Sequence, residues 1–294
     1  MATGIYTPTE ADKHIDEVWT TDIIRAQEFE LLIGKRVHQK YDYPGHGDVH
    51  HVRRWPNFEK ATKTPGSAWT PYKYTDTEQT ITINTYEVTG IQIEEITKIL
   101  SLTDAEMEAK KSFGYALARG VEVALANLFQ SFTQTVGVYG SELTWDRLLE
   151  GNQYLALAGV NADTEDVSMF LSAEAELGLK KIDLFVNSLY RGERGPSNIS
   201  KNLIAQDING AAVFRSNLLR VPSAGQHDCA LMDRRAIALV MAQEPKSFSE
   251  FVSLDLATVF GMYQLYGKSI ISRYAETPGN VTAADNWAVL IKTV

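Results

Sequence analysis

The sequence is short of the features that mark secreted, membrane and nucleic-acid-binding proteins. It has one cysteine, Cys229, so no disulfide can form within one chain and nothing depends on an oxidising compartment. No window approaches the roughly 18 consecutive apolar residues of a membrane-spanning helix, and no basic segment followed by an apolar run opens the chain as in a signal peptide. The net charge of -9 argues against binding by phosphate neutralisation. We expect no membrane contact and no sequence-specific DNA binding.

Motifs for catalysis and metal binding are also missing. Residues 46–51 (HGDVHH) contain metal-capable side chains, but a zinc site needs ligands on firm structure and this stretch is flanked by glycine. His227 and Cys229 have the spacing of neighbours on one strand face, but Cys229 opens an apolar run, which indicates a buried thiol. Residues 267–269 (GKS) end like a phosphate-binding loop but lack its first glycine. We expect no enzyme activity, no catalytic residue, no metal and no cofactor.

The chain carries enough hydrophobic sequence for a large folded core. Its 294 residues are 44% hydrophobic, which suits one large domain or two modest ones. Periodicity predicts helices at 14–33, 103–133, 144–158, 172–184 and 233–242, and strands at 48–55, 80–93, 167–171, 211–215, 229–232, 254–274 and 287–293. This order of elements predicts an α+β or mixed α/β fold.

A polar hairpin with two long arms is the most informative stretch. Thr64 to Ser67 (TPGS) places Pro and Gly at the centre of a type II turn. The returning strand, 80–93, alternates apolar and polar residues, but the apolar phase changes at Tyr86 and returns at Ile91. Such a change indicates a bulge, a strong twist or a strand that leaves one sheet and joins another. Because the hairpin has little apolar content of its own, we expect it to pack on another copy of the chain.

The helix predicted at 103–133 follows this hairpin. Thr103 and Glu106 form a capping box at its start, and apolar residues from Phe113 onward form one stripe. Gly114 and Gly120 each cost about 1 kcal/mol relative to alanine inside a helix. We therefore expect another element to pack closely against the side that carries these glycines.

Charges of opposite sign separate along this region. Residues 35–73 carry eight basic side chains and three acids, whereas residues 76–108 carry eight acids and one lysine. Such blocks can pair within one chain or between neighbours, and opposite charge on facing surfaces guides association. The predicted contact residues of the loop are Arg53, Arg54, Trp55, Lys60, Lys63, Trp69 and Lys73. Their predicted acidic partners are Asp76, Glu78, Glu94, Glu95, Asp104, Glu106 and Glu108.

Several short stretches resemble one known family. These are residues 75–96 (TDTEQTITINTYEVTGIQIEEI), 209–219 (NGAAVFRSNLL), 229–245 (CALMDRRAIALVMAQEP) and 260–273 (FGMYQLYGKSIISR). In content, order and spacing they resemble the major capsid proteins of tailed bacteriophages, which have the Hong Kong 97-type shell fold. The resemblance covers nearly the whole chain.

The resemblance implies a division into named parts. Residues 1–33 correspond to an N-terminal arm and 34–92 to the extended loop. Residues 93–160 and 248–275 correspond to a peripheral domain, with the spine helix at 103–133. Residues 161–247 and 276–294 correspond to an axial domain.

The resemblance implies a structural protein of the virion. Copies would form hexamers and pentamers of an icosahedral shell around double-stranded DNA, assembled in the host bacterial cytoplasm. Its partners would be other copies, a portal and a scaffolding protein on a separate chain, if any, since about 33 residues precede the loop. Decoration proteins and covalent crosslinks are left open. Two alternatives stay open as well: an encapsulin-type bacterial nanocompartment shell and a soluble α+β enzyme that forms an arm-exchanged dimer.

Overall fold

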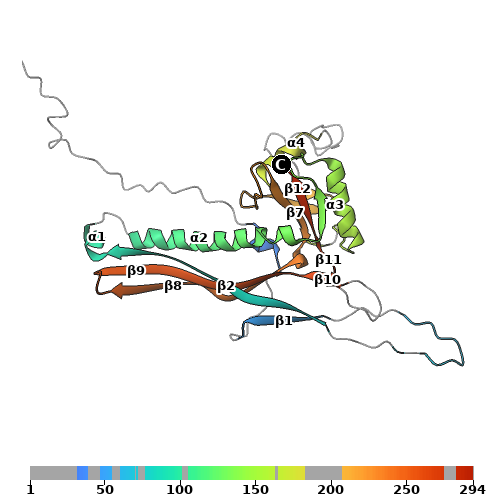
Figure 1. The fold of residues 1–294 in the computed structure, drawn as a ribbon, viewed down its shortest axis with the longest axis horizontal. Coiled ribbons are helices and arrows are strands. Elements are labelled where there is room, and N and C mark those ends of the chain that lie inside the picture. Colours follow the sequence, from blue (N-terminus) through green and yellow to red (C-terminus); the bar gives the residue numbers. More distant parts are fainter. Residues whose placement is uncertain are drawn as a thin grey trace, which may run out of the picture.

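The computed structural model describes residues 32–38, 47–54, 60–69, 71, 77–100, 105–162, 165–182, 207–274 and 283–293. Two sheets and a long helix dominate this part of the chain (Figure 1). The helices are α1 (Glu95–Leu100), α2 (Ala105–Ala126), α3 (Trp145–Leu157) and α4 (Ala173–Lys180), with 3-10 turns η2 (Gly34–Arg36), η3 (Phe129–Ser131) and η5 (Arg234–Ala236). The strands are β1 (Val49–Arg54), β2 (Thr77–Glu94), β3 (Gln134–Gly137), β4 (Val167–Leu171), β5 (Asp207–Ile208), β6 (Ala211–Arg215), β7 (His227–Asp233), β8 (Ile237–Val252), β9 (Ala257–Ile270), β10 (Ser272–Tyr274), β11 (Ala283–Asn286) and β12 (Ala288–Thr293).

An elongated four-stranded sheet forms one part of the molecule. Its order is β1-β2-β9-β8, and every pair of neighbours is antiparallel. Helix α2 runs along one face of this sheet (Figure 1). Gly120 of α2 lies so close to Glu87 of β2 that a Cβ there would meet the carboxylate at 2.6 Å. The close packing predicted on the glycine side is confirmed at Gly120, whereas a Cβ at Gly114 would meet nothing within 4 Å.

A six-stranded sheet forms the second part, in the order β3-β12-β7-β4-β6-β5. Strands β4 and β6, and β12 and β3, are parallel, and the other neighbours are antiparallel. All five residues of β4 are buried, as a central strand covered on both faces should be. The main hydrophobic core lies around this sheet and extends to the end of α2 through stacked phenylalanine rings. The centroid of the Phe129 ring lies 5.5 Å from that of Phe132 and 6.1 Å from that of Phe170.

The long strand β2 explains the change of apolar phase in the sequence. Its first part pairs with β1 and its second part with β9. The change of partner coincides with a register shift between Ile83 and Thr85, which is a bulge or irregularity of the kind that the phase change predicted. Ile81 and Ile83 are buried, whereas Tyr86 and Val88 are more than half exposed. The hairpin tip has the predicted turn, because Gly66 has a φ of +86° and Ser67 N–H donates to Thr64 O at 3.2 Å.

Two predicted helices differ from the structure. No helix forms at 233–242: a short 3-10 turn is followed by β8, whose residues Ile237–Val240 are all buried. A continuous apolar run does not distinguish a buried strand from a buried helix, and pairing with β9 decides for the strand here. The helix predicted at 103–133 ends at Ala126, after which the chain turns and places Phe129 and Phe132 in the second core.

Most of the remaining predicted helices and strands are present in the structure. The strands predicted at 167–171 and 211–215 have the bounds of β4 and β6, and those at 48–55, 80–93, 229–232 and 287–293 and the helices at 144–158 and 172–184 are present with shifted ends. The strand predicted at 254–274 begins only after the 253–256 turn and is divided into β9 and β10. The helix predicted at 14–33 lies almost wholly outside the described residues, and Thr103 of the predicted capping box also lies outside them. No helix in the part that the structure describes is long and apolar enough to cross a bilayer.

Candidate functional site

Within the described part of the chain, the candidate catalytic and metal-binding residues are not assembled into a reactive site. No group of three or more metal-capable side chains occurs among the described residues. Cys229 is buried, and desolvation raises the pKa of its thiol to about 12. Its Sγ accepts the Ser172 backbone N–H at 3.4 Å, while His227 Nε2 lies 3.1 Å from Glu174. The Cys229 thiol is therefore an unreactive part of the core. Residues 267–269 lie within strand β9 and do not form a phosphate-binding loop.

One buried carboxylate, Asp228, holds together the start of β7. It is completely buried, accepts from Tyr139 Oη at 2.5 Å and pairs with Arg220 at 2.6 Å. Desolvation and the hydrogen bond to this carboxylate raise the pKa of Tyr139 to about 12. The hydrogen bond that Arg220 donates to Asp228 raises the pKa of the Arg220 guanidinium. This arrangement stabilises the fold and has no free group to offer a substrate.

We expect the folded protein to lose stability in alkaline solution through Tyr139. Folding raises the pKa of its phenol to about 12, so the contribution is complete below the unfolded value near 10 and disappears as the pH rises through 12. The pKa of Tyr266 is raised in the same direction, by burial and by its bond to Glu87. Urea unfolding from pH 8 to 12 should show a falling free energy of unfolding, with a shallower fall in Tyr139→Phe. An unchanged slope in that variant would contradict this assignment.

The basic side of the predicted contact lies on β1 and the hairpin tip. Arg53 is exposed on β1, and Lys60, Lys63 and Trp69 are exposed around the tip, where Trp69 is 56% exposed. The backbone of Arg54 ends β1, but its side chain lies outside the described part of the chain. Trp55 and Lys73 lie outside the described residues altogether.

The predicted acidic residues fall into two places. Glu78 stands opposite Arg53 in the β1–β2 register, and its carboxylate lies 3.1 Å from His51 Nδ1, so it belongs to the loop. Glu94 is exposed at the other end of β2, and the next residue, Glu95, accepts from Thr258 Oγ1 at 2.6 Å. Of the predicted acidic residues, Asp76 and Asp104 lie outside the described part of the chain, as do the side chains of Glu106 and Glu108 in α2.

The two charged regions of one chain lie far apart. The tip projects beyond β1 at one end of the molecule, while Glu94, Glu95 and α1 lie at the other end (Figure 1). The length of β2 alone separates them by about 60 Å, at roughly 3.3 Å per residue. Lys60 and Lys63 therefore cannot reach Glu94 of their own chain, and a contact between these regions requires a second copy.

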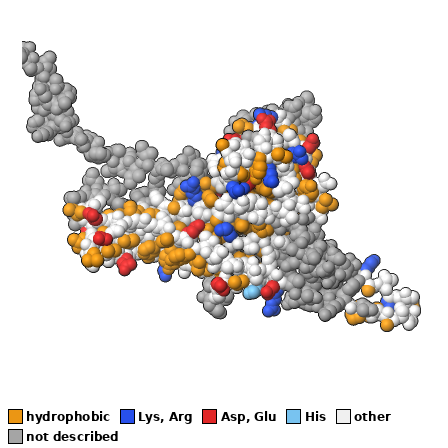
Figure 2. Space-filling view, in the orientation of Figure 1, with side chains coloured by type: hydrophobic (Ala, Val, Ile, Leu, Met, Phe, Trp, Pro, Cys, Tyr) orange, Lys and Arg blue, Asp and Glu red, His pale blue; other side chains and the backbone are white. Residues whose placement is uncertain are grey.

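An apolar surface lies on the face of the four-stranded sheet turned away from α2. We call it the open face: Tyr86 and Val88 of β2, Phe248 of β8, and Tyr263 and Leu265 of β9. The rings form a ladder across three strands, with centroids 5.9 Å apart for Tyr86–Tyr263 and 6.2 Å apart for Phe248–Tyr263. Figure 2 shows hydrophobic side chains gathered at the lower left of the molecule, on the side where the open face lies. The sequence prediction missed this surface, although the apolar residues at even positions in β2 were its signal.

Comparisons with known proteins find likeness in structure and not in sequence. No family model matches the chain, and no curated protein matches it. A chain from the head structure of Helicobacter pylori bacteriophage KHP40 matches with a TM-score of 0.75 and 12% identity, covering 100% of this chain and 99% of that one. A chain from the capsid of cyanophage P-SCSP1u gives 0.73 and 13%, covering 97% and 94%. A chain from the mature capsid of bacteriophage PhiM1 gives 0.72 and 12%, covering 95% and 92%.

These likenesses extend over nearly the full length of each chain. The match therefore includes both sheets and the long helix in the same relative arrangement. They agree with the α+β class and the family resemblance of the sequence. The chain therefore has the fold of the major capsid proteins of tailed bacteriophages, which are structural proteins.

Proposed function

We propose that this chain is the major capsid protein of a tailed bacteriophage, and that its copies assemble into hexamers and pentamers of an icosahedral shell. The observation that carries the proposal is the full-length likeness to chains from phage heads and capsids. The elongated shape supports it, because a hairpin that projects beyond its own sheet gains contacts only from another molecule (Figure 1).

In this proposal the hairpin is the extended loop, and it contacts the acidic end of a neighbouring copy. Lys60 and Lys63 would lie near Glu94 of the neighbour, a contact that separation forbids within one chain. The exposed rings of the open face offer apolar area to the same neighbour (Figure 2). Each contact is modest, but every subunit makes several, so the closed shell gains stability through multivalency.

The named parts of the family are retained as a proposal with adjusted limits. The N-terminal arm is 1–33, the extended loop 34–92, and α2 within 103–133 is the spine helix. The sheets support adjusted boundaries for the rest, because β3 and α3 lie with the six-stranded sheet and the whole of β8 lies in the four-stranded sheet. We place the axial domain on the six-stranded sheet and the peripheral domain on α2, β8 and β9, whose sheet is completed by β1 and β2 of the extended loop.

The shell is proposed to enclose double-stranded DNA without binding its sequence. The net charge of -9 suits a container that does not hold DNA by neutralising its phosphates. Its further partners are proposed to be a portal, a scaffolding protein on a separate chain and decoration proteins, with assembly in the host bacterial cytoplasm and the virion as the final location. DNA in particles from native material is expected, and particles that hold only a protein cargo would favour an encapsulin-type compartment.

The contact between copies is tested by exchanging charges. Lys63→Glu and Glu94→Lys are each expected to slow assembly about tenfold at low salt, because like charges then face each other across the interface. Combining both changes in one chain, or mixing the two single variants, should restore much of the rate because opposite charges meet again between copies. Light scattering during assembly and electron microscopy of the products provide the measurement.

The matched control is Arg147→Glu, which reverses a charge on α3 outside the proposed contact and should assemble at the wild-type rate. Single variants that both assemble normally, or a double variant as slow as the worse single one, would remove this pairing from the proposal. The absence of any shell from the wild-type chain under all salt conditions would overturn the capsid assignment itself.

A further inference from the structure

A buried carboxylate near the C-terminal end of α2 binds the short segment 32–38, which we call the strap. Glu122 is 2% exposed, and its two oxygens accept three consecutive backbone N–H groups: Leu32 at 2.6 Å, Ile33 at 2.5 Å and Gly34 at 2.9 Å. Backbone donors bound to an ionised carboxylate are strong hydrogen bonds, and they compensate the charge for its loss of water. The position of the strap on α2 is therefore set by one side chain.

The other side of the strap joins the four-stranded sheet. Val37 is completely buried, and His38 forms a parallel bridge with Ala238 at the start of β8. The bridge has two bonds, from His38 N–H to Ile237 O at 3.0 Å and from Leu239 N–H to His38 O at 3.1 Å. The strap thus connects the C-terminal part of α2 to the first residues of β8.

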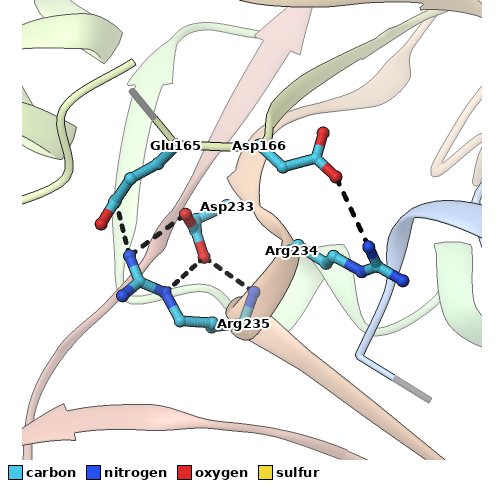
Figure 3. Close-up of polar contacts among 5 residues, drawn as sticks. All are labelled: Glu165, Asp166, Asp233, Arg234 and Arg235. Atoms are coloured by element: carbon cyan, nitrogen blue, oxygen red, sulfur yellow. Dashed lines mark hydrogen bonds and ion pairs between the residues drawn. The ribbon is translucent and has the colours of Figure 1, made fainter. Parts of the chain in front are cut away.

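Charged side chains tie the strap to the place where the two sheets join. The chain passes from β7 of the six-stranded sheet to β8 of the four-stranded sheet through η5. Asp166 pairs with Arg36 of the strap at 2.9 Å and with Arg234 of η5 at 3.8 Å. Figure 3 shows the neighbouring contacts, in which Arg235 binds both Asp233 and Glu165. Asp166 therefore links the strap to η5, where the chain crosses from the six-stranded sheet to the four-stranded sheet.

The sheet fixes the adjacent part of the same helix. Gln264 of β9 donates to the backbone oxygen of Leu117 at 2.9 Å and to Glu87 at 2.7 Å. Glu87 lies directly against Gly120 and also accepts from Tyr266 Oη at 3.0 Å. One and a half turns of α2, from residue 117 to 122, are thus bound by the sheet and by the strap.

We propose that the strap is a conformational latch that fixes the orientation of the two sheets, with Glu122 as the group that keeps it closed. In the closed state, α2, β8 and the crossing at η5 are linked through residues 32–38. When the strap leaves Glu122, these links open together, and the two sheets are free to change their relative orientation about η5. This inference concerns one chain and does not depend on whether copies assemble into a shell.

Hydrogen exchange of the full chain tests the latch. Glu122→Gln keeps the size of the side chain but removes its charge and replaces one acceptor by a donor. Exchange at residues 32–38 and 237–239 should become roughly 10- to 100-fold faster, as expected for loss of hydrogen bonds to a charged group, while β7 and β12 keep their protection. The control Glu150→Gln, which removes a partly exposed charge on α3 far from the strap in sequence, should leave all of these rates unchanged. Unchanged exchange of the strap in Glu122→Gln would overturn the latch.

A distance measurement tests the change of orientation. Spin labels at Leu157→Cys on α3 and Leu254→Cys at the β8–β9 turn report on the two sheets, and both positions are well exposed, at 71% and 94%. With the native Cys229 buried, labelling is confined to these sites. One narrow distance distribution is expected with Glu122 present, and a broader or shifted one with Glu122→Gln. If Glu122→Gln does not fold, Arg36→Ala weakens the same strap from its other side, and a distribution identical to wild type in a variant with faster strap exchange would overturn the proposal.

Discussion

A chain whose hairpin is closed short should fold but should make no closed shells. Residues 55–76 are replaced by Asn-Gly, a two-residue turn that joins Arg54 to Thr77, which are already cross-strand partners in β1 and β2. The buried residues of the hairpin base, Ile81 and Ile83, stay in place. The variant loses the basic tip, which is the part that we propose reaches a neighbour. Electron microscopy and light scattering should find no closed particles at concentrations where the wild-type chain forms them.

Two measurements separate failed assembly from failed folding. Circular dichroism should retain the strand content of the sheets, and the thermal midpoint should lie within a few degrees of wild type, because the deleted residues contribute no buried side chain among those described. In a second variant, residues 55–76 are replaced by a Gly/Ser segment of equal length. This variant keeps the length of the hairpin and removes its side chains, so it shows which of the two assembly requires. Normal shells from either variant would mean that the tip is not an assembly contact.

The fold could be predicted from the sequence where local signals and packing agree. The type II turn at Gly66 and the continuous apolar run of β4 each correspond to one backbone arrangement. The apolar run after Arg235 does not, because a buried helix and a buried strand read alike, and pairing with β9 determines the outcome. The early end of α2 has the same origin: Phe129 and Phe132 continue the helical stripe in sequence but pack into the second core.

The candidate contact surface could be predicted only in part. Charge separation along the sequence located the basic tip and the acidic end, but Glu78 was grouped with the acidic end and lies on the hairpin beside His51. The open face was missed, because Phe248 and Tyr263 are brought beside Tyr86 by strand order, which no local pattern contains. Glu122 was also missed, since a single acid in a helix does not reveal which distant backbone groups it will bind.

Removing the carboxylate of Asp228 should cause the largest loss of stability of any single change considered. Asp228→Ala is expected to lower the free energy of unfolding by roughly 2–3 kcal/mol, because Tyr139 and the partly exposed Arg220 both lose a completely buried, charged acceptor. Asp228→Asn keeps the shape and one acceptor but loses the charge, so its effect should be smaller. Urea unfolding at pH 7 measures both.

The matched control is Arg215→Ala, which breaks the more exposed ion pair with Glu176 and should cost at most about 1 kcal/mol. The double variant of Asp228→Ala with Tyr139→Phe should lose less than the sum of the two single losses, because the phenol no longer leaves an unpaired hydroxyl. A loss below about 1 kcal/mol for Asp228→Ala, or strict additivity with Tyr139→Phe, would show that the start of β7 is held by apolar packing and not by this carboxylate.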